Sequence, residues 1–174
     1  MRLLALDLAT RLGFAYGDSA RGNPVAGWHQ LPRTGDDIGA YAAAYHDWLR
    51  GMVAEAQPEM ITFEEPIPTQ AGRTTQTTAI KLTGLCWHTE FFAKMKNIRC
   101  TQVHGNTWKK ALTGSGKANK RMNPYPVLTA CRQRGWDVTD DNAADACGVW
   151  YYAASLVSPA EIGRFDPLFM VAAE

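Results

Sequence analysis

Acidic side chains mark three apolar segments of this chain of 174 residues. Asp7 closes the apolar run 4–7, Glu64 closes the run 61–64, and acids at 140, 141 and 145 open a third apolar segment. Carboxylates buried in an apolar fold cost several kcal/mol each unless a cation neutralises them. Hard divalent cations favour oxygen ligands. The pattern therefore predicts a metal site, and metal-dependent cleavage of phosphodiesters is our leading interpretation.

Asp7 and Glu64 each stand where a strand is expected to end. Ligands of open α/β sheets bind at the carboxyl ends of strands. Strand alternation puts Glu64 on the same face as Thr62, whereas Glu65 points the other way and precedes Pro66. We therefore expect Glu64 to be the ligand, with Glu65 as the reserve.

The third acidic segment reads as the start of a helix. At about 100° per residue, Asp141 and Asp145 differ by about 40° and share a face, with Asn142 about 60° to the other side of Asp145. Asp140 faces elsewhere and is a candidate N-cap. Acids in a first helical turn also favour the helix dipole, which accounts for Asp140 and Asp141 but not for Asp145.

Several acids in one place suit phosphodiester chemistry. The attacking hydroxide and the phosphodiester repel each other, and two metal ions about 3.5–4 Å apart relieve that repulsion. Magnesium binds few protein carboxylates and keeps waters that exchange with substrate. Asn142 adds a neutral oxygen that can bind a metal or orient a water.

Two polar segments are candidates for contact with DNA. The span 106–121 contains no acid, and its centre at 114–116 is Gly-Ser-Gly, which lets backbone N–H groups approach phosphate. The span 67–78 follows Glu64, also lacks acids and carries Gln70 and Arg73. Both segments are also compatible with solvated loops, or with a helix entry capped by threonines. The basic candidates of the first span are Lys109, Lys110, Lys117, Lys120 and Arg121.

Composition limits the protein class. The net charge of +1 excludes a generic polycation, so local charge must provide any affinity for nucleic acid. There is no apolar stretch of about 18 residues, so we expect no membrane span, and the N-terminus has no signal-peptide pattern. The four cysteines contain no C-x-x-C pair, which predicts free thiols in the cytoplasm.

The periodicity predicts a single α/β domain over residues 1–157, followed by a tail at 158–174. A turn is expected at 11–13, and the helix at 74–96 has more apolar residues than one face needs, which indicates burial on several sides or a partner subunit. The order of elements argues for a mixed sheet with helices on both faces. Strands are expected at 2–9, 14–16, 25–31, 60–64 and 98–103, and helices at 37–56, 74–96, 105–112, 120–134 and 140–156.

The remaining polar and aromatic residues give weaker signals. The four histidines form no metal-binding spacing, and His104, after the last predicted strand, is the one worth testing. The tryptophans fit core packing, and Trp108 beside Lys109 is the one candidate for stacking on nucleic acid.

Together these motifs resemble the RuvC family of Holliday-junction resolvases, within the RNase H-like superfamily. The resemblance covers nearly the whole chain and implies an RNase H-like fold with a five-stranded mixed sheet. A divergent, phage-encoded member fits the details. The motifs are Leu4-Ala5-Leu6-Asp7 with Gly13 beyond, Phe63-Glu64-Glu65-Pro66, the lysine segment from Trp108 to Lys120, and Asp141-Asn142-Ala143-Ala144-Asp145-Ala146.

The resemblance implies a homodimer that nicks two opposed strands of a four-way DNA junction, with four carboxylates binding two Mg²⁺ or Mn²⁺ ions. Asp7, Glu64 and Asp145 carry over by position. The fourth family acid stands three residues before the last, which here is Asn142, and Asp141 is our substitute. Lys109 and Lys120 match the family lysines. The loop at 67–76 would probe the junction centre, and the second long helix would form the dimer interface.

Three other functions are compatible with the sequence. The span 7–13 resembles the first phosphate loop of actin-like ATPases, which need two such domains. A broader branched-DNA or flap endonuclease of phage DNA processing uses the same site. A non-catalytic junction-binding protein is the third, because Asn142 replaces a carboxylate.

Overall fold

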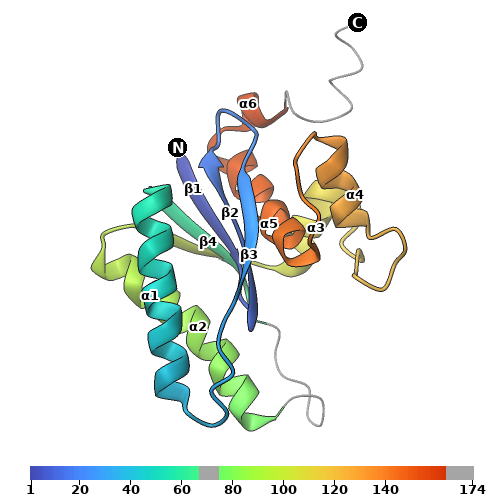
Figure 1. Cartoon of the computed structure of the whole chain (residues 1–174). Helices are drawn as coiled ribbons and strands as arrows, with labels where there is room; N and C mark the ends of the chain where they lie inside the picture. Colours follow the sequence, from blue (N-terminus) through green and yellow to red (C-terminus); the bar gives the residue numbers. More distant parts are fainter. Residues whose placement is uncertain (67–74, 164–174) are drawn as a thin grey trace, which may run out of the picture.

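A mixed five-stranded sheet organises the part of the chain that the computed structural model describes, residues 1–66 and 75–163 (Figure 1). The strand order is β3-β2-β1-β4-β5. The first three strands are antiparallel neighbours, whereas β4 is parallel to both β1 and β5. The strands are β1 (Arg2–Asp7), β2 (Arg11–Asp18), β3 (Val25–Gln30), β4 (Met60–Glu64) and β5 (Arg99–Val103).

Six helices are described, and the long ones divide between the two faces of the sheet (Figure 1). Leu4 and Leu6 of β1 pack with the first two helices, whereas Leu3 and Ala5 pack with those that follow β5. The sheet is therefore buried on both faces, as predicted. The helices are α1 (Ile38–Ala56), α2 (Gln76–Met95), α3 (Gly105–Thr113), α4 (Pro126–Gln133), α5 (Asp141–Val157) and α6 (Pro159–Ile162).

Helix α5 is the most deeply buried helix and lies across β1 and β2. Its first half is rich in small residues, so its backbone approaches the sheet closely. A Cβ on Gly13 of β2 would lie 2.0 Å from the carbonyl oxygen of Asn142. The absence of a side chain at Gly13 therefore allows the N-terminus of α5 to reach the end of β1.

The predicted turn at 11–13 is wrong. These residues belong to β2, where Gly13 pairs with Asp7 of β1 and with Trp28 of β3. The actual connection is 8–10. Gly13 resembles a turn residue in the sequence, but it is a strand residue whose missing side chain makes room for a helix.

One helix boundary and one part of the predicted tail also differ from expectation. The helix predicted at 120–134 begins only at Pro126, because proline lacks the N–H that a helix interior needs and fits the first helical position. The predicted tail contains the short helix α6. In the part of the chain that is described, no helix is long and apolar enough to cross a membrane.

Candidate functional site

Asp7 and Glu64 come together because β1 and β4 are parallel neighbours. Leu6 pairs with Phe63. The next residues, Asp7 and Glu64, are the last of their strands and therefore lie together at the carboxyl ends of β1 and β4. Leu3 and Ala5 face α5, so Asp7, two residues further along the strand, faces α5 as well. Thr62 faces this side too, and Glu64, two residues further along β4, lies on the same face, where Trp108 contacts it.

Asp145 reaches the same place from α5. It is one of four buried polar residues of the described chain. Tyr125 donates a hydrogen bond from its hydroxyl to Asp145 Oδ1, and Lys120 Nζ lies 2.9 Å from Asp145 Oδ2. Both carboxylate oxygens of Asp145 therefore have a protein donor.

Asp140 faces away from this cluster, as the helical arithmetic predicts. It caps α5 by accepting hydrogen bonds from the backbone N–H groups of Asn142 and Ala143. It also pairs with Arg11, whose guanidinium lies 3.9 Å from the ring centroid of Trp28. These contacts attach the start of α5 to β2 and β3.

Lys120 lies among the acidic groups. Its ammonium nitrogen is 2.7 Å from Asn142 Oδ1 and 4.0 Å from Asp7 Oδ2, in addition to its contact with Asp145. Of the two residues proposed to complete the site, Asn142 is therefore the one that joins this cluster. Asp141 is partly exposed, and no hydrogen bond or ion pair of its side chain is found within the described ranges.

Glu64 is held by α3. Trp108 Nε1 donates to Glu64 Oε2 at 3.0 Å, and Lys109 Nζ lies 3.9 Å from Glu64 Oε1. A Cβ on Gly105 would come within 2.4 Å of Glu64 Oε1, so the first residue of α3 must be small. The prediction that Trp108 stacks on nucleic acid is wrong, because its side chain is fully buried.

Trp108 depends in turn on a glycine of α5. A Cβ on Gly148 would lie 2.4 Å from the indole ring of Trp108. Sequence reasoning missed this residue, although a glycine inside an apolar helix is a signal of close packing. It also missed Tyr125, for which the sequence offers only a position between two prolines.

Burial and mutual repulsion raise the pKa values of the acids. Burial, followed by the charge of Asp145, raises the pKa of Asp7 to about 7, with the lysines acting in the opposite direction. Burial also raises the pKa values of Glu64 and Asp145. The pKa of Asp7 is higher in the folded chain than its ordinary value of 3.8. The contribution of this group to the free energy of unfolding is therefore full below pH 3.8, where the carboxyl is protonated, and it is lost as the pH rises through 7 and the carboxyl ionises inside the fold.

The predicted DNA-binding residues are divided among several places. Lys109 touches Glu64 and Lys120 joins the carboxylates, whereas Lys110 on α3 and Lys117 and Arg121 after it are exposed. Gln70 and Arg73 lie outside the described residues.

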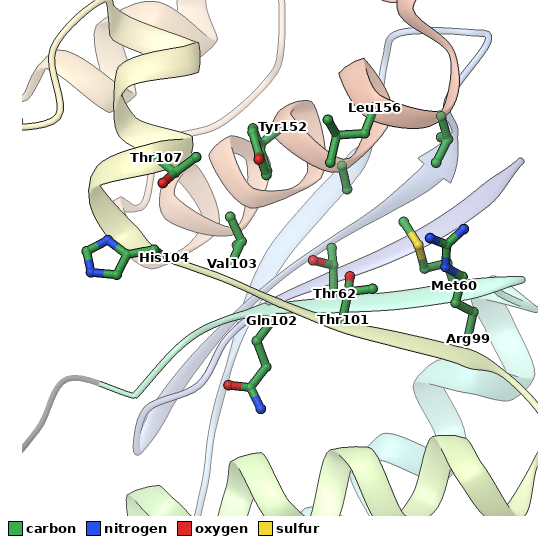
Figure 2. Close-up of a pocket in the computed structure, with 12 residues that line it drawn as sticks. Met60, Thr62, Arg99, Thr101, Gln102, Val103, His104, Thr107, Tyr152 and Leu156 are labelled. Carbon is green, nitrogen blue, oxygen red and sulfur yellow. The ribbon is translucent and has the colours of Figure 1, made fainter.

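His104 lies apart from the acids. It caps α3, where its Nδ1 accepts from the N–H of Asn106 at 3.3 Å. It also lines a cavity of about 300 Å³ that follows β5 between α3 and the end of α5, together with Thr62, Thr107 and Tyr152 (Figure 2). No acidic side chain lines this cavity, so it is separate from the carboxylate cluster.

The donor atoms of the cluster are of the kind that a hard divalent ion binds. Asp7, Glu64 and Asp145 supply carboxylate oxygens, and Asn142 supplies an amide oxygen. Among the described residues, no group of three or more acidic, histidine or cysteine side chains is arranged to hold a metal ion. This agrees with the presence of Lys120 between the acids and with the contacts of Glu64 to α3.

Comparisons with known proteins identify the fold. No family model matches the sequence, and no curated protein matches it. In structure, the chain is similar to Thermus thermophilus RuvC, with a TM-score of 0.62 and 17% identity over 90% of this chain and 95% of that one.

Two further solved structures are similar. One is T. thermophilus RuvC in complex with a Holliday junction substrate, with a TM-score of 0.68 and 14% identity over 90% of this chain and 94% of that chain. The other is the yeast mitochondrial Holliday junction resolvase Ydc2, with a TM-score of 0.55 and 14% identity over 99% of this chain and 81% of that chain. The predicted RuvC-like, RNase H-like fold is confirmed.

Gly148→Ala tests how tightly α5 holds Trp108. The added methyl group overlaps the indole, and overpacking of this kind costs about 1–3 kcal/mol, so the free energy of unfolding should fall. Gly51→Ala in α1 is the matched control, because no atom lies within 4 Å of the added Cβ. It should gain about 0.5–1 kcal/mol from helix propensity. Urea denaturation measures both, and a Gly148→Ala variant as stable as the wild type would contradict the packing.

Proposed function

We propose that this chain is a divalent-metal-dependent endonuclease that resolves four-way DNA junctions by paired, symmetric nicks. The observation that carries the proposal is the convergence of Asp7, Glu64 and Asp145 from β1, β4 and α5 beside two lysines. The fold shared with RuvC, including a RuvC structure in complex with a Holliday junction substrate, supports this choice of substrate. We assign the function to residues 1–157, and the free thiols fit the cytoplasm of a bacterium or phage-infected cell.

In this proposal the three carboxylates hold Mg²⁺ or Mn²⁺. A bound divalent ion supplies a hydroxide nucleophile at neutral pH and neutralises charge that builds on the phosphate. The resemblance to RuvC implies two such ions. Trp108 orients Glu64, and Tyr125 orients Asp145, so these two carboxylates are fixed before substrate arrives.

The lysines act on the phosphate. Lys109 and Lys120 are close enough to the carboxylates to interact with a phosphodiester placed there, and their charge favours the more negative transition state. Lys110, Lys117 and Arg121 are exposed around the site and would contact the DNA backbone outside it. Gln70 and Arg73 remain proposed contacts of the junction centre.

We further propose that the active form is a homodimer joined through α2. Four apolar side chains of this helix are exposed, at residues 80, 87, 91 and 95, with Trp87 at 67% and Met95 at 69%. At about 100° per residue they fall within an arc of about 80° and so form one stripe. Trp87 and Phe91 stack with their ring centroids 5.6 Å apart. Two sites related by a twofold axis suit a twofold-symmetric junction.

One specific observation favours a second candidate. Asn142 stands where a fourth carboxylate is expected, and Lys120 binds it, which suits a junction-binding protein without catalysis. A broader branched-DNA endonuclease is the other alternative, since the same site would act on flaps. A panel of branched DNAs distinguishes this broader endonuclease from a junction resolvase, because the broader enzyme would also cut flaps.

Cleavage of an immobile four-way junction tests the proposal. With Mg²⁺ or Mn²⁺ the wild type should give nicks at symmetric positions, and EDTA should abolish them. Asp7→Asn should lower the rate by more than about 100-fold, a loss reached even by outer-shell partners of metals, while junction binding persists. Asp47→Asn, on the exposed face of α1, is the control and should cut normally. A bound but uncut junction would instead support the non-catalytic binder.

Trp87→Lys tests the dimer. A buried tryptophan at an interface contributes about 2 kcal/mol, and a twofold interface contains it twice, so dimerisation should weaken about a thousandfold. Light scattering after gel filtration measures the oligomer. On a cruciform plasmid, the dimer should give linear product and the variant mainly nicked circles. Leu156→Lys, which changes an exposed apolar residue outside the stripe, should remain dimeric. Linear product from a monomeric variant would contradict the paired mechanism.

A further inference from the structure

Trp28 on the edge strand β3 is exposed on the face of the sheet that carries the acids. Gly13 of β2 pairs with Asp7 on one side and with Trp28 on the other, so these three residues form one row across the sheet. Directly paired residues of neighbouring strands point to the same face. Ala26, two residues before Trp28, packs against the core cluster that contains α5, so this face is the one that α5 covers. Trp28 therefore lies on the same side of the sheet as Asp7.

The distance from Trp28 to the acids suits a strand of DNA. Neighbouring β-strands lie about 4.8 Å apart, so the backbones of Trp28 and Asp7, two strand positions apart, are separated by about 10 Å. Stacked DNA advances about 3.4 Å per nucleotide along each strand, so a strand whose phosphate lies at Asp7 reaches Trp28 within about three nucleotides. Trp28 is thus placed to contact the bases next to the scissile phosphate of the proposed reaction.

The core does not account for the position of Trp28. The residue is 47% exposed, and within the described residues it is not among the apolar side chains that pack against either core cluster. Its ring lies under the guanidinium of Arg11, 3.9 Å from the ring centroid, and Arg11 is held in turn by Asp140. The ring is therefore oriented in advance. Arg11 covers one face of the ring, and the exposed surface is available to a second planar group.

Positive charge continues past this ring at the same end of the sheet. The N–H of Leu31, just after β3, donates to the carbonyl oxygen of Thr10 at 2.9 Å, which keeps the chain next to the connection between β1 and β2. Arg33 follows and is exposed. The acids at 36 and 37 are hydrogen-bonded to α2 and to the start of α1. An exposed aromatic ring beside arginines suits a nucleic acid, because its bases stack while its phosphates are attracted.

We propose that Trp28 stacks on an unpaired base of the cleaved strand, within about three nucleotides of the scissile phosphate, and so favours branched over intact DNA. This inference rests on the proposed nuclease function. Stacking on a side chain needs a free base face, and in an intact duplex neighbouring bases cover both faces. Bases at a branch point lose a neighbour, so the contact forms there. It is independent of base identity, because every base has a π-face, and Arg11 behind the ring adds to the attraction.

Binding of branched and intact DNA tests the inference, with every variant built on Asp7→Asn, which should bind without cutting. Trp28→Leu keeps an apolar side chain but no ring, and it should bind the four-way junction about 5- to 150-fold more weakly, the range for a lost stacked base. Its affinity for an intact duplex should not change. The salt dependence of junction binding should not change either, since no phosphate contact is lost. Fluorescence anisotropy of labelled DNA measures all three.

Two further variants are the controls. Trp28→Phe keeps an aromatic ring and should restore most of the junction affinity. Val25→Ala changes another exposed apolar residue of β3, on the opposite face of the sheet, and should bind both DNAs as the Asp7→Asn parent does.

Each outcome decides between the alternatives. Unchanged junction affinity in Trp28→Leu, equal losses on junction and duplex, or a Trp28→Phe variant as weak as Trp28→Leu would overturn the inference and leave the nuclease intact. A parent that binds neither DNA would overturn the proposed function as well. If thermal melting shows that Trp28→Leu does not fold, the parent is photocrosslinked to junctions carrying 5-iodouracil at single positions around the nick. Crosslinking to the peptide of Trp28 within about three nucleotides of the nick is expected, and its absence would overturn the inference.

Discussion

The rest of the structure depends on one electrostatic constraint, the repulsion among three carboxylates that are largely withdrawn from water. Burial, and after it the charge of Asp145, raises the pKa of Asp7 to about 7, so loss of hydration adds to the repulsion at this residue. The surrounding residues reduce the repulsion without removing it. Lys120 lies between Asp7 and Asp145, Lys109 approaches Glu64, and donors from Trp108 and Tyr125 take up carboxylate oxygens. In the proposed function, this site binds a cation because its acids are held together before the cation arrives.

The fold keeps the acids together by bringing backbones unusually close. The parallel pairing of β1 and β4 sets Asp7 and Glu64 side by side at the carboxyl ends of these strands. Gly13 lets α5 approach that edge, and Gly148 lets Trp108 pack against α5 and hold Glu64. The two glycine contacts leave no room for a Cβ atom, so the geometry of the site also depends on residues that have no functional group. Helices α1 and α2, the second of which carries the apolar stripe, cover the face of the sheet opposite to the one that α5 covers (Figure 1).

The periodicity of the sequence predicted the features that are determined within a single strand or helix. It gave the strand ends at Asp7 and Glu64, the choice of Glu64 over Glu65, and the separation of Asp140 from Asp145. It failed where a residue serves a distant element. Gly13 suggested a turn because the sequence cannot show that α5 packs over it. Trp108 suggested a surface contact because its partner is 40 residues away in α5, and the roles of Tyr125 and Asn142 depend on how the loop before α4 folds back over the acids.

The stability of the wild type and of Asp7→Asn, measured by urea denaturation from pH 4 to 8 in EDTA and in Mg²⁺, tests the central claim most directly. In EDTA the wild type should lose stability relative to the variant as the pH rises from 3.8 through 7. At pH 8 the variant should be more stable by about 1–4 kcal/mol, since it has no buried charge to repel its neighbours. Mg²⁺ should stabilise the wild type and leave the variant nearly unchanged. Equal stabilities across this range in EDTA, together with no response of the wild type to Mg²⁺, would contradict the account.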